Sequence, residues 1–287
     1  MVSSYEVSSS LNDNPSERIA SLRVACYNIA HGRGLAQDDW SGGTPDERIQ
    51  RLTDIAELLK SLDADVLILN EVDFDASWSN RINQAEFLAE AAGYRYVAEQ
   101  RNLDFRMLWR TWRFGNAILS RYPITHSEVI DFPGYSNAET LLAGKKRGLA
   151  CTVDVDGRAV RILAVHLSHR SEALRSKSAD LLIAPTNLPT ILAGDLNSTP
   201  TGFPRSKTSA DHGNAIDKID ASGLFTRRPT DPPVDPAEFT FHAEKPINVI
   251  DWIMITKDLA FADYRVIDSL LSDHRPIVAD LVFTPAP

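Results

Sequence analysis

Amides, carboxylic acids and imidazoles stand at or near the ends of apolar, strand-like segments throughout this sequence. Amide and carboxylate oxygens favour a hard cation such as Mg²⁺ or Mn²⁺, and histidine adds the capacity to transfer a proton or stabilise charge. This set of side chains predicts metal-assisted attack on a phosphate ester. Its members are Asn28, Glu71, His166, Asp195, Asn197, Asp251, Asp273 and His274.

Asp251 is the hardest of these residues to explain by local structure, because it lies in the middle of the apolar run 249–253. A carboxylate inside an apolar strand is costly unless it is paired or binds a cation. Each of the other polar residues, taken alone, could simply be a turn former at the end of a strand. The functional prediction therefore depends on their convergence at one place in the fold.

Segments rich in apolar and β-branched residues recur along the chain, and several alternate between apolar and polar residues as strands do. Asp156-Gly157 predicts a tight turn between two of these strands. The predicted strands cover residues 22–29, 65–72, 94–98, 116–120, 148–155, 159–168, 189–195, 249–256 and 276–283.

The segment 44–62 predicts the clearest helix. Thr44 can cap it, Pro45 suits the first turn, and Glu47 completes a capping box. Strands adjacent in sequence, with occasional helices between them, favour an α+β fold with mixed or antiparallel sheets. The expected apolar stripe of the helix consists of Ile49, Leu52, Ile55, Ala56 and Leu59. Further helices are predicted over 81–92 and 170–183.

The chain has 287 residues, of which 43% are hydrophobic, and its net charge is -9. This length allows a sizeable core. The acidic balance argues against a protein that coats nucleic acid through long-range attraction. Residues 1–20 are polar and lack the apolar centre of a signal peptide, so we expect a flexible tail and a cytoplasmic protein. We expect residues 21–287 to form a single domain.

Seven motifs carry a resemblance to a known family, and the resemblance covers about residues 22–284. In sequence order they are "ACYNIAHGRG", "LILNEVD", "FGNAILSRYPI", "AVHLSHRSEALR", "ILAGDLNSTP", "VIDWIMI" and "SDHRPIVADL". The chain resembles the endonuclease/exonuclease/phosphatase superfamily in these motifs and in their order. The resemblance implies a four-layer α/β/β/α sandwich, in which two mixed, largely antiparallel sheets pack face to face with helices outside.

The resemblance also implies roles for individual residues. Glu71 is similar to the principal metal ligand of the family, with Asn28 beside it and Asp273 as a supporting or second ligand, for Mg²⁺ or Mn²⁺. Asp195 and Asn197 resemble the groups that position the attacking water and the phosphate.

The remaining implied roles concern catalysis and phosphate contact. His166 is similar to the first of two site histidines, and Asp251 and His274 to an Asp–His pair. We expect a carboxylate oxygen of Asp251 to lie about 2.6–3.2 Å from a ring nitrogen of a neutral His274. Arg147 and Asn116 are candidates for phosphate contact, although Arg147 could equally be a solvated charge and Asn116 a turn residue.

The predicted loop 101–114 alternates arginines with aromatic residues, which could hold phosphates and stack on rings. The same pattern could instead cover the edge of the core. A basic rim on an acidic protein favours a local phosphate pocket over a track for duplex DNA, so we expect no stable duplex complex.

We expect a metal-dependent phosphoesterase, with a phosphodiester as the favoured substrate. A phosphomonoesterase acting on a sugar or inositol phosphate is the alternative within that class, and a non-catalytic module that binds a phosphate ligand is the alternative outside it. The substrate could be a nucleic acid, a nucleotide, an inositol phosphate or a phospholipid headgroup.

Overall fold

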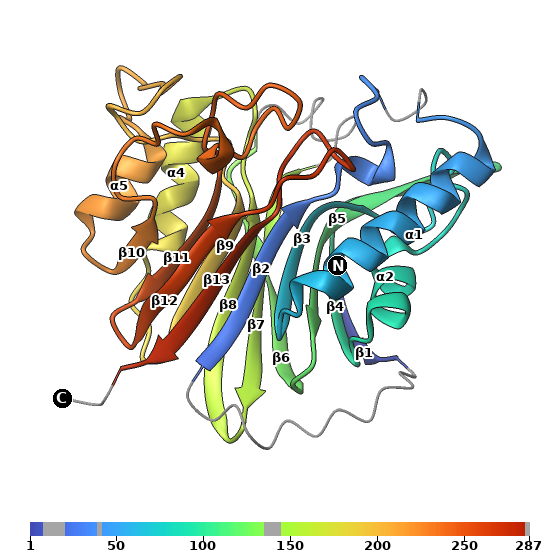
Figure 1. The fold of residues 1–287 in the computed structure, drawn as a ribbon, viewed down its shortest axis with the longest axis horizontal. Coiled ribbons are helices and arrows are strands. Elements are labelled where there is room, and N and C mark those ends of the chain that lie inside the picture. The colour runs from blue at the N-terminus through green and yellow to red at the C-terminus, as the bar shows by residue number, and fades with distance from the viewer. Residues whose placement is uncertain (8–20, 39–41, 135–144, 285–287) are drawn as a thin grey trace.

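The computed structural model describes residues 1–7, 21–38, 42–134 and 145–284. Two β-sheets pack face to face, with α1 and α2 outside one sheet and α4 and α5 outside the other (Figure 1). The predicted four-layer sandwich is therefore confirmed. None of the helices in the described part of the chain is both long and apolar enough to cross a membrane.

The first sheet has seven strands in the order β1-β4-β5-β3-β2-β13-β12. Only β2 and β3 run parallel, and the other neighbouring strands are antiparallel. The strands are β1 (Val2–Glu6), β2 (Ser21–Asn28), β3 (Val66–Asp73), β4 (Tyr96–Met107), β5 (Arg110–Ser120), β12 (Leu259–Val266) and β13 (Ile277–Phe283).

The second sheet has six strands in the order β10-β11-β9-β8-β7-β6. Here β8 and β9 are the parallel pair, and β7 and β8 form the hairpin predicted around Asp156-Gly157. The strands are β6 (Ile124–Asp131), β7 (Arg147–Val155), β8 (Arg158–His166), β9 (Thr190–Asp195), β10 (Phe225–Arg228) and β11 (Asp251–Thr256).

The helices begin at capping residues that the sequence supplies. Thr44 and Glu47 form the predicted capping box of α1. Ile49, which we expected on the buried stripe, is 41% exposed because it lies at the edge of the apolar face. The α-helices are α1 (Pro45–Leu62), α2 (Gln84–Ala92), α4 (Glu172–Leu182) and α5 (Ala215–Ala221), and the 3₁₀ helices are Ala30–Gly32 and Pro236–Glu238.

Within the described part of the chain, three apolar clusters hold the layers together. One contains buried residues of α1, α2 and the seven-stranded sheet, such as Leu59, Leu88 and Leu69. The second includes residues from facing strands of the two sheets, such as Ile68 and Ile162. The third contains α4, α5 and the six-stranded sheet. Burial of both faces of each sheet explains why many strands are apolar over their whole length.

Two predictions about the surface are wrong. Residues Val2–Glu6 do not belong to a flexible tail, because they add an edge strand to β4; residues 8–20 lie outside the described part of the chain. The segment 101–114 is not a loop, because β4 and β5 continue through it as a long hairpin. Its arginines and aromatics alternated in a way that fits a two-faced strand as well as a loop.

Strand direction determines where the polar strand ends lie. Strand β13 is antiparallel to β2, and β11 is antiparallel to β9. In the seven-stranded sheet, the carboxyl ends of the parallel pair β2–β3 therefore lie at the same edge as the amino end of β13. In the six-stranded sheet, the carboxyl ends of the parallel pair β8–β9 lie at the same edge as the amino end of β11. Contacts between β2 and β9 bring the two edges together.

Candidate active site

Five of the predicted site residues meet at this shared edge. Asn28 ends β2, His166 ends β8 and Asp195 ends β9, whereas Asp251 begins β11. Asp195 pairs with His166 on one side and with Asp251 on the other, in adjacent strands. The loop before β13 then adds His274. The sequence prediction that these side chains converge is correct in its geometry.

Gly194 allows β9 to approach β8 closely at this point. Its φ is +145°, and a Cβ atom here would lie only 1.8 Å from the carbonyl oxygen of Val165. No other residue fits, because that separation is far below van der Waals contact. The glycine before Asp195 therefore lets the carboxylate stand directly beside the end of β8.

Asp251 and His274 form the expected pair. The carboxylate oxygens of Asp251 lie 2.9 and 3.1 Å from Nδ1 of His274, which confirms the predicted distance. The two residues are only 1% and 6% exposed. The backbone amide of His274 donates to Oγ of Ser272. The ring of Phe241 packs on the imidazole, with 4.8 Å between the two ring centroids. The imidazole is thus fixed on several sides.

The electrostatic setting of His274 differs from our expectation of a neutral imidazole. Burial alone would lower the pKa of His274, but Asp251, Asp195 and Asp273 raise it to about 10. Without a bound cation, the ring is therefore an imidazolium at neutral pH. Burial also raises the pKa of Asp195, and the nearby Asp251 and Glu71 carboxylates raise it further. The sequence could not reveal this balance, because it depends on three carboxylates contributed by separate strands and loops.

Asn28 connects the two sheets across the site. Its Nδ2 donates to Oδ2 of Asp195 at 3.1 Å and lies 3.4 Å from Nε2 of His274. Its Oδ1 accepts from the backbone amide of Ala30 at 3.0 Å, which leaves that oxygen one further lone pair. The amide therefore orients Asp195 while keeping an oxygen that can contact a cation.

Glu71 lies at a β-bulge in β3 and has a φ of +52°. Bulges redirect a side chain out of its usual alternation, and this one turns Glu71 toward three cationic or imidazole groups. Its Oε2 is 3.5 Å from Nε2 of His31 and 3.5 Å from Nη1 of Arg33, and its Oε1 is 3.7 Å from Nε2 of His166. Burial would raise the pKa of Glu71, but His31 and Lys146 hold it well below its usual range.

His31 and Arg33 are site residues that our sequence analysis missed. Nδ1 of His31 is 2.7 Å from Asp73, a carboxylate with no exposure. Arg33 lies between Glu71 and Asp273, 3.5 and 3.2 Å from their oxygens. Both follow the end of β2 in "NIAHGRG", so an imidazole and a guanidinium directly after Asn28 were a usable signal.

Lys146, and not Arg147, enters the site. Nζ of Lys146 lies 2.9 Å from Nε2 of His166 in a half-buried position, and this loss of solvent lowers its pKa. Arg147 points away, toward Asp131 and the carbonyls of Arg101 and Asn102. Successive side chains of an extended chain face opposite sides, so Lys146 faces the site and Arg147, which we expected to contact the phosphate, faces away from it.

Asn116 does not face an open phosphate position, contrary to our expectation. It is fully buried, with Nδ2 donating to Gln100 and to the carbonyl of Arg147, and Oδ1 accepting from Asn70. Asn70 in turn accepts from the backbone amide of Asp195 at 2.8 Å. Asn116 therefore supports Asp195 through a chain of buried amides.

Asn197 stands two residues beyond Asp195 with a φ of +50°. Its backbone amide donates to Oδ1 of Asp195 at 2.8 Å, and its Nδ2 donates to the carbonyl of Leu167 at 3.3 Å. This turn holds the carboxylate from one side while Asn28 holds it from the other.

The donor set fits a hard divalent cation. Glu71 and Asp273 converge on the same guanidinium of Arg33, so these carboxylates already face a cationic group. Asp195, Asp251 and His274 also have ligand atoms within 4.8 Å of one another. Carboxylate oxygens with an amide oxygen from Asn28 are the ligands that Mg²⁺ and Mn²⁺ prefer.

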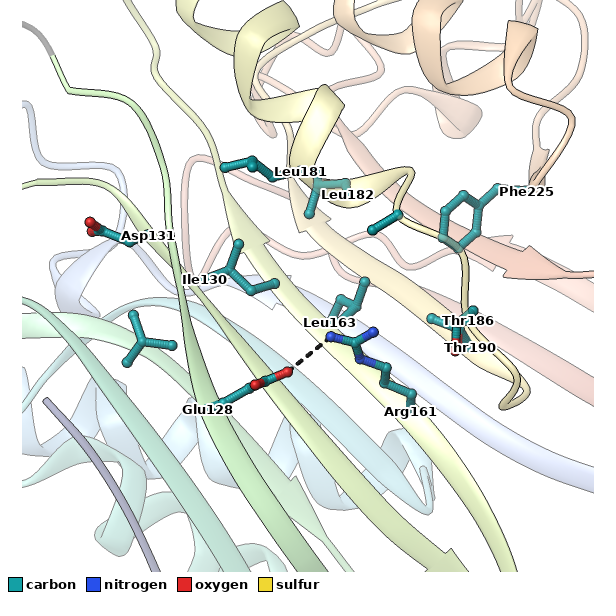
Figure 2. A pocket seen from close by; sticks show the side chains of 12 residues that line it. Glu128, Ile130, Asp131, Arg161, Leu163, Leu181, Leu182, Thr186, Thr190 and Phe225 are labelled. Atoms are coloured by element: carbon teal, nitrogen blue, oxygen red, sulfur yellow. Dashed lines mark hydrogen bonds and ion pairs between the residues drawn. The ribbon is translucent and has the colours of Figure 1, made fainter.

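Two cavities differ in their relation to this site. One of about 390 Å³ includes Asn197 and Phe241 in its lining and so adjoins the site. The other, of about 280 Å³, lies between β6, β8 and the end of α4. Figure 2 shows the Glu128–Arg161 ion pair beside Leu163, with Leu182 on the opposite side of the view. None of the predicted site residues lines this second cavity.

Comparison with known proteins agrees with the geometry. The sequence profile described as the endonuclease/exonuclease/phosphatase family matches residues 25–274. The chain belongs to the endonuclease/exonuclease/phosphatase family. Members of this family are phosphoesterase hydrolases, which confirms the expectation of an enzyme of that class.

Individual relatives extend this comparison. The chain is 26% identical to the uncharacterized protein YbhP of Escherichia coli over 245 residues, 80% of this chain and 88% of that protein. Its fold is similar to a family structure from Beutenbergia cavernae, with a TM-score of 0.68 and 22% identity over 93% of this chain and 73% of that one. It is also similar to a mannosyl-6-phosphatase of Bacteroides thetaiotaomicron, with a TM-score of 0.64 and 19% identity over 91% and 100%.

The buried pair makes the stability of the metal-free protein depend on pH. Because the pKa of His274 is raised from 6.5 to about 10, the pair stabilises the fold fully below pH 6.5 and loses this contribution as the pH rises through 10. Asp251→Asn should therefore lower the free energy of unfolding by about 3 kcal/mol at pH 6, and by progressively less toward pH 10.

Urea unfolding in excess chelator at several pH values measures this difference. The exposed Asp231→Asn serves as the matched control and should leave stability within about 0.5 kcal/mol at every pH. If Asp251→Asn lowered the free energy of unfolding by the same amount from pH 6 to pH 10, the assigned charge state of His274 would be contradicted.

Proposed function

We propose that this protein hydrolyses a phosphate ester with the help of Mg²⁺ or Mn²⁺, and that a phosphodiester is its preferred substrate. The observation that carries the proposal is the Asp251–His274 pair at 2.9 Å, with Asp195 3.7 Å from the other ring nitrogen. An imidazolium and a carboxylate of raised pKa stand side by side there. These are the two groups that hydrolysis by water requires, one for the developing negative charge and one for the proton.

Glu71, Asn28 and Asp273 are the residues that would hold the cation. When bound, the cation polarises the phosphate and lowers the pKa of a coordinated water. Arg33 bridges Glu71 and Asp273, so a bound cation would share these carboxylates with its guanidinium or displace it. Arg33 is then available to hold a phosphate oxygen through two parallel hydrogen bonds.

Asp195 acts on the attacking water, and His274 acts on the phosphate. Asp195 accepts the proton of the attacking water, because its raised pKa brings it closer to the working pH than an ordinary carboxylate. Nε2 of His274 donates a hydrogen bond to the phosphoryl oxygen on which charge develops. Asp251 is a positioning residue, since it acts by fixing the charge and orientation of His274.

Lys146 and His166 favour a diester over a monoester. Both kinds of ester release an alcohol, which is a poor leaving group unless a proton reaches its oxygen. A monoester can carry that proton on its own phosphate, whereas a diester has none and depends on an acid of the protein. The ammonium of Lys146 lies 2.9 Å from Nε2 of His166, and burial lowers the pKa of both. Either Lys146 directly, or His166 after taking its proton, can protonate the leaving oxygen.

Turnover should require a divalent cation. Hydrolysis of an aryl phosphodiester should disappear in excess chelator and return with Mg²⁺ or Mn²⁺, because the carboxylates of Glu71 and Asp273 repel the phosphate unless a cation lies between them. Glu71→Gln should raise the Mg²⁺ concentration for half-maximal rate by about 10-fold or more, since it removes a charged ligand.

A remote Glu→Gln change provides the control. Glu128 pairs with Arg161 beside the second cavity, and Glu128→Gln should leave the Mg²⁺ requirement unchanged. Full activity of the protein with the metal shown to be absent would contradict the proposal of a metal-dependent reaction. A normal Mg²⁺ requirement in the Glu71→Gln protein would contradict the proposed role of Glu71 as a ligand.

A phosphomonoesterase is the second candidate, and one observation favours it. Three cationic groups, Arg33, Lys146 and His274, surround the carboxylates, which suits the dianion of a monoester. The similar fold of a protein named a mannosyl-6-phosphatase agrees with this candidate. The two candidates differ in whether Lys146 donates a proton or only contributes charge.

Rates on matched compounds separate the candidates. We expect an alkyl phosphodiester to be hydrolysed at least about 10-fold faster than the matching alkyl monoester, and Lys146→Met to abolish that preference. Single-stranded oligonucleotides should be preferred to duplex DNA, because the net charge of -9 opposes long duplex contacts. Faster hydrolysis of the monoester by the unmodified protein would replace the diester proposal with the monoester one.

A further inference from the structure

The 390 Å³ cavity beside the catalytic centre has no role in the chemistry described above. It begins at Asn197, which holds Asp195, and at Phe241, whose ring packs on His274. Its lining also includes Arg205, Lys207 and Asn248. A group in this cavity would therefore be a direct neighbour of a phosphate held at the centre.

The charge of the cavity is not balanced. Its carboxylate, Glu172, is fully engaged: it pairs with Nε of Arg175 at 2.7 Å and accepts from Ser198 and from the backbone amide of Ala215. Arg205 and Lys207 are exposed at the rim of the cavity and form no ion pair with any residue in the described ranges, although the protein carries an excess of acidic residues. Two unpaired cations in one cavity favour an anionic ligand.

Asn248 provides a second observation that points to a ligand. Its Oδ1 is buried, and among the described residues it has no hydrogen-bond partner. A buried acceptor without a partner destabilises the protein unless something else donates to it. Asn248 lines the cavity, so a rotation of its side-chain amide toward the cavity would let a ligand hydroxyl or amino group supply that hydrogen bond.

We propose that this cavity binds a second phosphate group of the substrate, covalently joined to the ester that is hydrolysed. Arg205 and Lys207 hold the second phosphate through charge-assisted hydrogen bonds, and Asn248 accepts from a neighbouring hydroxyl or amino group. The inference rests on the proposed function, since it names the kind of ester that the same centre attacks. The substrate is then a compound with two phosphate groups on one small framework.

Two sources supply this chemistry, a short phosphorylated nucleotide chain and a bisphosphorylated sugar. Each can be tested with a matched pair of probes that differ only in the second phosphate. The first pair is a thymidine dinucleotide with and without a 5′-phosphate. The second pair is glucose 1,6-bisphosphate and glucose 1-phosphate.

Binding is measured by titration calorimetry with Mg²⁺ in the His274→Ala protein, so that turnover does not interfere. The cavity variant is Arg205→Ala with Lys207→Ala. The control variant, Lys177→Ala with Lys257→Ala, removes the same charge from two exposed lysines that do not line the cavity. In one of the two pairs, we expect the parent protein to prefer the doubly phosphorylated probe by at least about 10-fold.

The cavity variant should reduce that preference to less than about 2-fold and leave the affinity for the singly phosphorylated probe nearly unchanged. The control variant should retain the preference. The pair that shows the effect identifies the source. The inference is overturned if neither pair of probes shows a preference, or if the preference survives in the cavity variant. It is also overturned if the cavity variant lowers the affinity for both probes of a pair by the same factor.

Catalytic measurements keep the two proposals apart. If the unmodified protein hydrolyses no phosphate ester but the preference through Arg205 and Lys207 is found, the proposed function fails and the cavity assignment stands. If metal-dependent hydrolysis is found without the preference, only the cavity assignment fails.

Discussion

A carboxylate buried to 1% exposure between apolar neighbours is the constraint on which this structure depends. Asp251 belongs to the six-stranded sheet, whereas His274 precedes β13 of the seven-stranded sheet. Their contact therefore joins the two sheets at the edge where the polar strand ends gather. Because removing one member of a buried ion pair leaves an uncompensated charge, the fold and the centre cannot be altered independently at this point. Asn28 and Asp195 form a second link between the sheets.

Alternating charges explain how so many ionisable groups can share a small volume. Each carboxylate at the centre has a cationic or imidazole neighbour: Asp251 has His274, Glu71 has His31 and Arg33, and Asp273 has Arg33. The result is a centre that is already charged before any ligand arrives. Such preorganised charge lowers the cost of stabilising a transition state, because little rearrangement is required.

Much of the centre was predictable from sequence because strand ends are local features. The apolar segments before Asn28, Glu71, His166 and Asp195 are strands, and parallel pairing brings their ends together. The helix 44–62 was predictable from its cap. Side-chain direction was not: Lys146 and Arg147 are neighbours, and only the backbone shows which one faces His166. Nor could composition show that β4 and β5 continue through 101–114, or that the side chain of Asn116 is hydrogen-bonded within a buried chain of amides.

A double-mutant cycle on kcat tests the central claim, that Asp251 acts on the reaction only through His274. Aryl phosphodiester hydrolysis is measured for the unmodified protein, Asp251→Asn, His274→Ala and the double variant, at saturating Mg²⁺. The account predicts that His274→Ala lowers kcat by at least about 100-fold and Asp251→Asn by at least about 10-fold. It also predicts that Asp251→Asn lowers kcat by less than about 2-fold when it is introduced into the His274→Ala protein. If Asp251→Asn lowered kcat by the same factor in both backgrounds, the two residues would act independently and the account would be wrong.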